Sequence, residues 1–140
     1  MKVSFTGTQR GMTEQQKAKV RARLIGLRPT AVVHGGCIGA DDEFDEIAAK
    51  LGIDRYVFPC DIESKRIPDN VLRMRTGSNV VIMPPKPPLE RNKTIVMAGD
   101  ILLVCPKEKS EILRSGTWST YRYGKKQVSW RAYDVELILP

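Results

Sequence analysis

Short apolar runs alternate with segments of helical periodicity along the whole chain. The runs predict strands at residues 2–5, 30–34, 54–58, 100–105 and 128–133. Residues 80–83 fit a further short strand, and residues 135–139 either extend the preceding strand or form another. The segments between them predict helices that begin near Thr13, Ala40, Glu90 and Thr117. Strand and helix therefore alternate.

Local signals support two of these helices most clearly. Residues 13–16 read Thr-Glu-Gln-Gln, a capping box, and Val20, Leu24 and Leu27 follow at helical spacing. The helix after Ala40 has an apolar stripe and ends before Gly52, where a C-cap is expected. Residues 60–90 predict instead a long loop with one turn of helix, closed by the stiff proline-rich segment 84–88.

Strands that are apolar throughout are typical of a parallel sheet covered on both faces. We therefore expect one domain over residues 1–140. Its expected class is α/β, a doubly wound, mostly parallel, Rossmann-like sheet of about five to six strands with helices on both faces. In such a sheet, ligands bind beyond the carboxyl ends of the strands.

Glycines punctuate the turns at that edge. Residues 34–41 read His-Gly-Gly-Cys-Ile-Gly-Ala-Asp after the second strand, and Ser115-Gly116-Thr117 lies beyond the strand at 100–105. Glycine lets backbone N–H groups approach a ligand closely, and a helix N-terminus carries partial positive charge. The spacing matches neither the dinucleotide fingerprint nor a Walker A loop. The two turns predict a pocket for a phosphorylated small molecule, most simply a nucleotide.

The residues expected to bind that ligand come from four segments. They are Gly7, Thr8, Gln9, Gly35, Gly36, Gly39, Asp41, Arg91, Asn92, Ser115, Gly116 and Thr117. Arg91 is expected to face phosphate, because a guanidinium forms charge-assisted bonds with it. Alternatives stay open: the glycines also suit a tight turn, and Asp41 also suits a helix N-cap. His34, Cys37, Trp118 and Tyr121 suit packing, although contact of His34 with the substrate stays open and the last two also suit a dimer interface.

Charge and composition narrow the expected partners. The formal net charge is +7, which favours anionic partners, although the basic residues of the first helix are scattered along it. Three cysteines and one histidine indicate neither a disulfide framework nor a metal site, and we expect no cofactor. No apolar run approaches the roughly 20 residues of a membrane span. With no signal region at the start, the expected location is the cytoplasm.

The chain also resembles a known group of proteins through four motifs. They are Phe5 to Thr13, His34 to Asp41, Glu90 to Asn92, and Arg114 to Tyr123. These segments are similar to those of the SLOG superfamily, the Rossmann-like group that includes the LOG cytokinin-activating phosphoribohydrolases and the DNA-processing protein DprA. The likeness is greatest to small uncharacterised bacterial and phage members, and residues 60–88 and the last ten carry it least.

The resemblance to the LOG enzymes includes two matching motifs and one missing catalytic residue. Arg91-Asn92 takes the place of the Arg-Lys dipeptide of the LOG enzymes, and Gly116-Thr117 takes the place of their Gly-Thr turn. The catalytic glutamate of those enzymes falls at Thr120, which has no carboxylate to steady a developing ribosyl cation or to handle a water. The resemblance therefore implies phosphate binding and puts phosphoribohydrolase activity in doubt.

Three functional hypotheses follow. The first is a domain that binds a nucleotide or an ADP-ribose-like ligand as a sensor, carrier or sequestering protein. The second is a nucleotide N-glycosidic hydrolase or transferase in which Asp41 or Glu90 replaces the missing glutamate and Arg91 assists. The third is a binder of single-stranded nucleic acid, which the net charge alone supports. A homodimer is expected from related folds, and no membrane partner is expected.

Overall fold

The computed structural model describes residues 1–140 and has six strands, five α-helices and one 3-10 turn. The strands are β1 (Lys2–Gly7), β2 (Ala31–His34), β3 (Asp54–Val57), β4 (Val80–Ile82), β5 (Ile101–Cys105) and β6 (Asp134–Leu137). The helices are α1 (Glu14–Leu27), α2 (Ala40–Lys50), α3 (Asp69–Met74), α4 (Pro88–Ala98) and α5 (Gly116–Gln127), with the 3-10 turn at Glu63–Lys65. None of the helices is both long enough and apolar enough to cross a membrane.

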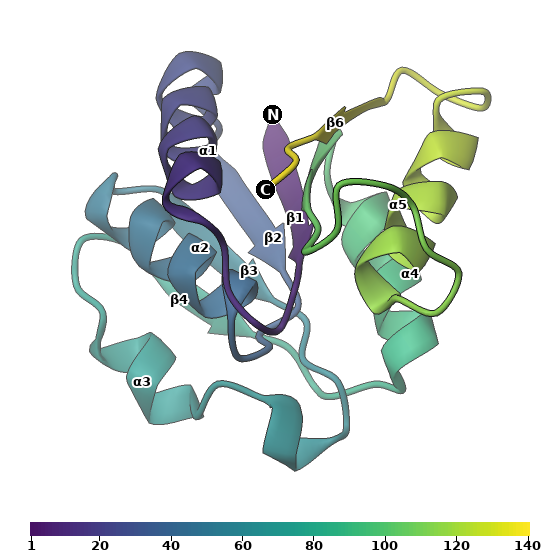
Figure 1. Ribbon diagram of the computed structural model, residues 1–140. Helices are drawn as coiled ribbons and strands as arrows, with labels where there is room; N and C mark the ends of the chain where they lie inside the picture. The colour runs from purple at the N-terminus through teal and green to yellow at the C-terminus, as the bar shows by residue number, and fades with distance from the viewer.

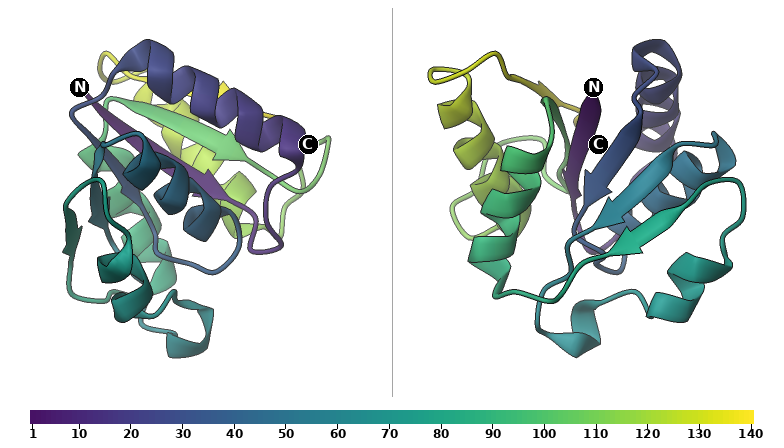
Figure 2. Two further views of the ribbon diagram at one scale, coloured as in Figure 1. Left: turned by 90° about the vertical axis from the view of Figure 1, so that its left-hand side faces the viewer. Right: turned by 180° about the vertical axis from the view of Figure 1, so that it is seen from behind.

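All neighbouring strands are parallel, in the order β4-β3-β2-β1-β5-β6. The chain moves outward from β1 to β4, returns through α4, and then moves outward the other way from β5 to β6. Helices α1 and α2 therefore cover one face and α4 and α5 the other (Figure 1 and Figure 2). This confirms the doubly wound, Rossmann-like α/β sheet expected from the sequence. Its order reverses between β1 and β5, where such folds leave a crevice.

The main core lies between the sheet and helices α1 and α2. Val3 and Phe5 of β1 pack with Val20 and Leu24 of α1, and all four are almost fully buried. Phe5 stacks on Phe44 of α2 with ring centroids 4.1 Å apart. The capping box at the start of α1 is present in both directions, between Thr13 and Gln16. The apolar periodicity and the cap together place α1 where the sequence predicts it.

The chain between β3 and α4 is more ordered than a long loop. It contains the 3-10 turn, α3 and β4, and β4 confirms the short strand expected at residues 80–83. Helix α3 lies on the same face of the sheet as α2, because Arg55 of β3 bonds both Asp45 of α2 and the Leu72 carbonyl of α3. Helix α4 starts at Pro88, two residues before the expected start.

The expected strand at residues 128–133 is wrong. Helix α5 continues to Gln127, and the next residues form turns in which Trp130 and Arg131 donate backbone bonds to the Gln127 carbonyl. The β-forming residues Val128 and Trp130 are exposed, so no sheet face fixes them in an extended form. The sixth strand comes later, at Asp134–Leu137, and pairs with β5.

Candidate functional site

A polar cavity of about 190 Å³ lies at the carboxyl edge of the sheet, where the strand order reverses. We call it the β1–β5 cavity. Its lining comes from the end of β1 and the turn after it, the β2–α2 turn, α4, and the chain from β5 into α5. The lining residues are Phe5, Thr6, Gly7, Thr8, Gln9, Gly35, Cys37, Asp41, Arg91, Asn92, Ile95, Lys107, Glu108, Ser115, Gly116 and Thr117.

Arg91 is the one arginine in this lining, and it is 8% exposed. Its Nη1 donates to the Gly35 carbonyl at 2.8 Å and lies 3.5 Å from the Cys37 sulfur. Its Nε is buried without a hydrogen-bond partner. The ion pairs of the protein all join other residues. A buried guanidinium without a carboxylate partner favours an anionic ligand.

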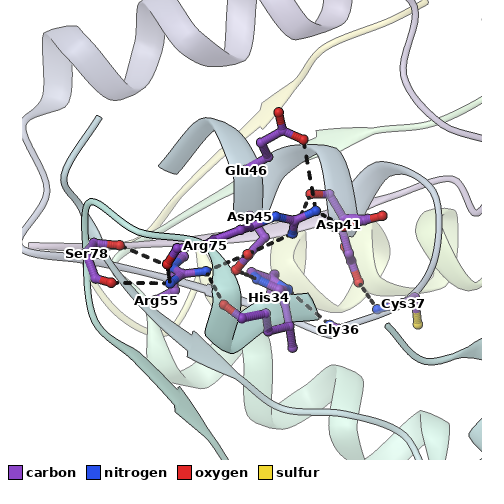
Figure 3. A network of polar contacts seen from close by, with 11 residues as sticks. His34, Gly36, Cys37, Asp41, Asp45, Glu46, Arg55, Arg75 and Ser78 are labelled. Carbon is purple, nitrogen blue, oxygen red and sulfur yellow. Dashed lines mark hydrogen bonds and ion pairs between the residues drawn. The ribbon is translucent and has the colours of Figure 1, made fainter. Parts of the chain in front are cut away.

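Asp41 and Cys37 share the same wall of the cavity. The Cys37 backbone N–H donates to Asp41 Oδ2 at 3.1 Å, an interaction drawn in Figure 3. Burial raises the pKa of the Asp41 carboxyl above its ordinary value. Burial also raises the pKa of the Cys37 thiol to about 11, and the Asp41 charge adds to this effect. Cys37 is thus a thiol at neutral pH and a poor nucleophile.

The three glycines of the β2–α2 turn have different surroundings. A Cβ on Gly35 would lie 1.9 Å from Arg91 Nη1, so Gly35 makes room for the guanidinium. Gly36 has a φ of +63°, and a Cβ there would lie 2.6 Å from a methyl group of Val57. Gly39 has a φ of +90° and packs on the backbone of Gln9. Of the three, only Gly35 lines the cavity.

The N-terminus of α5 forms another wall. Ser115 is its N-cap and accepts a hydrogen bond from the Trp118 backbone N–H at 3.2 Å. The first N–H groups of a helix have no intrahelical partner, and here these belong to Gly116 and Thr117, which both line the cavity. Thr120, where the LOG-type glutamate was expected, is 2% exposed and donates to the Gly116 carbonyl at 2.8 Å. It does not line the cavity.

A second buried polar group lies on the other side of the β2–α2 turn (Figure 3). We call His34, Asp45, Arg55 and Arg75 the Asp45 cluster. Asp45 Oδ1 is 2.8 Å from His34 Nε2, and Asp45 Oδ2 accepts from Arg55 and Arg75 at 2.7 and 2.9 Å. Because His34 Nδ1 accepts from the Gly36 N–H, the ring proton is on Nε2, facing Asp45.

The charges of the Asp45 cluster satisfy one another. Although burial raises the pKa of Asp45, the hydrogen bonds from His34 and Arg75 and the charge of Arg55 bring it down to about 2. Arg55 donates further bonds to Ser78 and to the Leu72 carbonyl, and Arg75 also pairs with Asp42. Every member has protein partners, so this cluster is structural, and His34 belongs to it and not to the cavity.

Most of the residues that the sequence predicts for the site meet at the cavity. Ten of them line it: Gly7, Thr8, Gln9, Gly35, Asp41, Arg91, Asn92, Ser115, Gly116 and Thr117. Gly36 and Gly39 shape the turn outside the lining. Glu90 is exposed on α4, in a shallow surface depression with Lys93, Thr94, Met97 and Ala98, and does not reach the cavity.

Lys107 and Glu108 also line the cavity, although the sequence does not predict them as site residues. Glu108 is half-buried and accepts a hydrogen bond from the Trp118 indole N–H at 2.9 Å. In the sequence they open a charged loop that reads as solvated. The useful signal was their place directly after the buried strand β5, at the same edge as the glycine turns.

Comparison with known proteins does not assign the β1–β5 cavity to a family or to a function. No three His, Cys, Asp or Glu side chains gather in a way that would hold a metal ion. No protein-family model matches the chain, and no curated protein matches it with significance.

Proposed function

We propose that this protein binds a nucleotide or an ADP-ribose-like phosphorylated ligand in the β1–β5 cavity, as a sensor, carrier or sequestering protein. The observation that carries the proposal is Arg91, a buried guanidinium without an ion-pair partner that lines a polar cavity. The cavity is at the reversal of strand order, where doubly wound sheets bind ligands. The motifs shared with the SLOG superfamily favour the same class of ligand.

The start of α5 supports a phosphate as the charged part of that ligand. The partial positive charge of the helix N-terminus and the N–H groups of Gly116 and Thr117 suit an oxyanion. Lys107, exposed at the rim, adds a second cation. A guanidinium, an ammonium and a helix N-terminus around one small cavity together favour a dianionic group.

The first experiment is to identify a ligand and then remove its counter-charge. Native mass spectrometry of freshly purified protein looks for a co-purified nucleotide, and calorimetry measures its affinity. A charge-assisted hydrogen bond contributes about 1.5–3 kcal/mol, so Arg91→Ala is expected to weaken binding roughly tenfold or more. Arg73→Ala, which removes an exposed arginine of α3, is the matched control and is expected to bind as wild type does.

Two results count against the proposal. One is the failure of a panel of nucleoside mono- and diphosphates and ADP-ribose to bind at millimolar concentration. The other is unchanged affinity in Arg91→Ala for every ligand that does bind, which would place the site elsewhere.

A second candidate function is hydrolysis of an N-glycosidic bond. It is favoured by Asp41, a cavity carboxyl whose pKa burial raises toward the range useful for general acid–base chemistry. Glu90, the other carboxylate considered for this role, is outside the cavity, whereas Glu108 is inside it. Base release from nucleoside monophosphates by wild type, lost in Asp41→Asn, would put hydrolysis ahead of binding alone.

A further inference from the structure

We propose that His34 positions Arg91 for ligand binding by fixing the peptide group between Gly35 and Gly36. The part that concerns the ligand rests on the proposed function, whereas the positioning of Arg91 is a property of the protein alone. His34 is fully buried and does not line the β1–β5 cavity, so it reaches no ligand itself. Its effect passes through the backbone that separates it from Arg91.

The peptide group between Gly35 and Gly36 is held at both of its polar ends. Its carbonyl accepts a hydrogen bond from Arg91 Nη1 at 2.8 Å, on the side of the cavity. Its N–H donates to His34 Nδ1 at 3.0 Å, on the side of the Asp45 cluster (Figure 3). This one peptide group therefore joins the two buried charged regions of the protein.

The local sequence does not keep this peptide group in one orientation. Both flanking residues are glycine, and Gly36 has a φ of +63°, in a region that glycine enters and leaves without steric cost. A peptide group turned over would point its N–H toward the Arg91 guanidinium and its carbonyl toward His34 Nδ1. Two donors would then face each other on one side, and two acceptors on the other. Because both glycines are buried, that arrangement is unfavourable.

The Asp45 cluster selects the observed orientation because it fixes the proton of the His34 ring. Asp45 Oδ1 lies 2.8 Å from His34 Nε2 and accepts the Nε2 proton, which leaves Nδ1 as an acceptor. Two arginines hold the other oxygen of Asp45 in place. A ring with this proton distribution accepts from the Gly36 N–H and so keeps the preceding carbonyl turned toward the cavity.

Two substitutions of His34 separate the roles of its two nitrogens. An asparagine amide oxygen takes the place of Nδ1 and accepts from the Gly36 N–H, but the side chain is too short for Asp45. A glutamine amide nitrogen takes the place of Nε2 and donates to Asp45, but leaves no acceptor at Nδ1. His34→Gln is expected to weaken AMP and ADP-ribose about five- to tenfold in calorimetry, as part of the Arg91 contribution is lost. His34→Asn is expected to be less stable but to bind within about twofold of wild type.

Arg75→Ala is the matched control for a loss of stability. It removes a half-buried member of the Asp45 cluster and leaves both nitrogens of His34 with their partners. Urea unfolding should show a lower free energy of unfolding, whereas AMP should bind within about twofold of wild type, because the Gly36 N–H keeps its acceptor.

A double-mutant cycle tests the route through Arg91. In an Arg91→Ala background, His34→Gln is expected to weaken AMP by less than about twofold, because the side chain that His34 positions is gone. Independent effects of the two substitutions would multiply instead.

NMR on the protein without ligand tests the geometry. In wild type, the nitrogen chemical shifts of His34 should place the ring proton on Nε2, and a scalar coupling should join Nδ1 to the Gly36 amide nitrogen. This measurement does not depend on whether a variant folds. The Arg91 Nε–H signal, identified by its absence in Arg91→Ala, should move in His34→Gln and keep its position in His34→Asn.

The outcomes separate this proposal from the proposed function. A ring proton on Nδ1, equal loss of affinity in the two His34 variants, or multiplied effects in the double mutant overturns the positioning role and leaves nucleotide binding standing. If neither AMP nor ADP-ribose binds to wild type, the proposed function is wrong. The Arg91 signal then decides the positioning role, which is overturned if the signal keeps its position in His34→Gln.

Discussion

Two buried charged regions lie on opposite sides of the β2–α2 turn, and they differ in how their charges are satisfied. In the Asp45 cluster, one carboxylate accepts from His34, Arg55 and Arg75. In the β1–β5 cavity, Arg91 has a carbonyl and a sulfur for partners and an unpaired Nε. A closed network fixes the position of α2 and α3 on the sheet, whereas an open one leaves its charge available to a ligand.

The largest expected effect is on stability, at Asp45. Asp45→Ala leaves the buried Arg55 guanidinium, and the half-buried guanidinium of Arg75, without their shared carboxylate, which is expected to lower the free energy of unfolding by about 3–5 kcal/mol. Urea unfolding followed by tryptophan fluorescence measures this. Asp61→Asn, which changes an exposed carboxylate, is the control. If Asp45→Ala does not fold, Arg75→Ala tests the same cluster from its half-buried side.

The same region predicts how stability responds to acid. The pKa of Asp45 is about 2 in the folded protein, against about 3.9 for an unperturbed aspartate. Because the folded pKa is the lower one, its contribution of about 2–3 kcal/mol is fully present above about pH 5 and is lost as the pH falls through 2. Unfolding free energies measured from pH 7 to pH 2 should fall over that range, and less so in Asp45→Asn.

Asp41 should respond to pH in the opposite direction. Its pKa is raised in the folded protein, so its ionised form disfavours folding, and protonation as the pH falls relieves that effect. We therefore expect Asp41→Asn to be more stable than wild type at pH 7, with the difference shrinking in acid. An Asp41→Asn variant that is less stable than wild type at pH 7 would contradict this. It would mean that protein partners stabilise the ionised Asp41 carboxylate, as they do the Asp45 carboxylate.

Two adjacent glycines sharpen the comparison, because Gly35 lines the β1–β5 cavity, whereas the Gly36 N–H donates to His34 of the Asp45 cluster. A Cβ on Gly35 collides with Arg91, so Gly35→Ala is expected to reduce ligand affinity roughly tenfold or more. A Cβ on Gly36 meets Val57 at a positive φ, so Gly36→Ala is expected to lower stability by about 1–2 kcal/mol with affinity retained. Calorimetry and urea unfolding on both variants check this, and the reverse pattern would exchange the roles of the two glycines.

The smallest expected effect is at Thr120. Thr120→Val removes a hydrogen bond to the Gly116 carbonyl within α5, which is expected to change stability by less than about 1 kcal/mol. Ligand affinity should not change, because Thr120 is outside the cavity. A large loss of affinity would show that this position acts on the ligand.

The sequence predicted the architecture well because its main signals are local. Alternating apolar runs and helical stripes, the capping box at Thr13 and the glycines after β2 each act within a few residues of the chain. The strand expected at 128–133 failed because β-propensity was read without a sheet face to support it. The sixth strand depends on pairing with β5, which is about 30 residues away.

The candidate site was predictable only in part, for the same reason. Gly35, Arg91 and Gly116 are marked by motifs, whereas Glu108 is marked only by its place after β5. The Asp45 cluster was missed altogether. Asp45, Arg55 and Arg75 stand on separate elements, and each looks like a surface charge until the fold brings the three together.

The pairing of β1 with β5 has a consequence for the order in which this chain assembles. Val3 pairs with Ile101, and Gln16 donates to the carbonyls of Pro106 and Ile138, so the middle of the sheet joins segments about 100 residues apart. Strand β1 leaves the ribosome well before its partner β5 exists. During synthesis the β1 edge that pairs with β5 stays unpaired until β5 emerges, and the β1–β5 cavity takes shape only after that late docking.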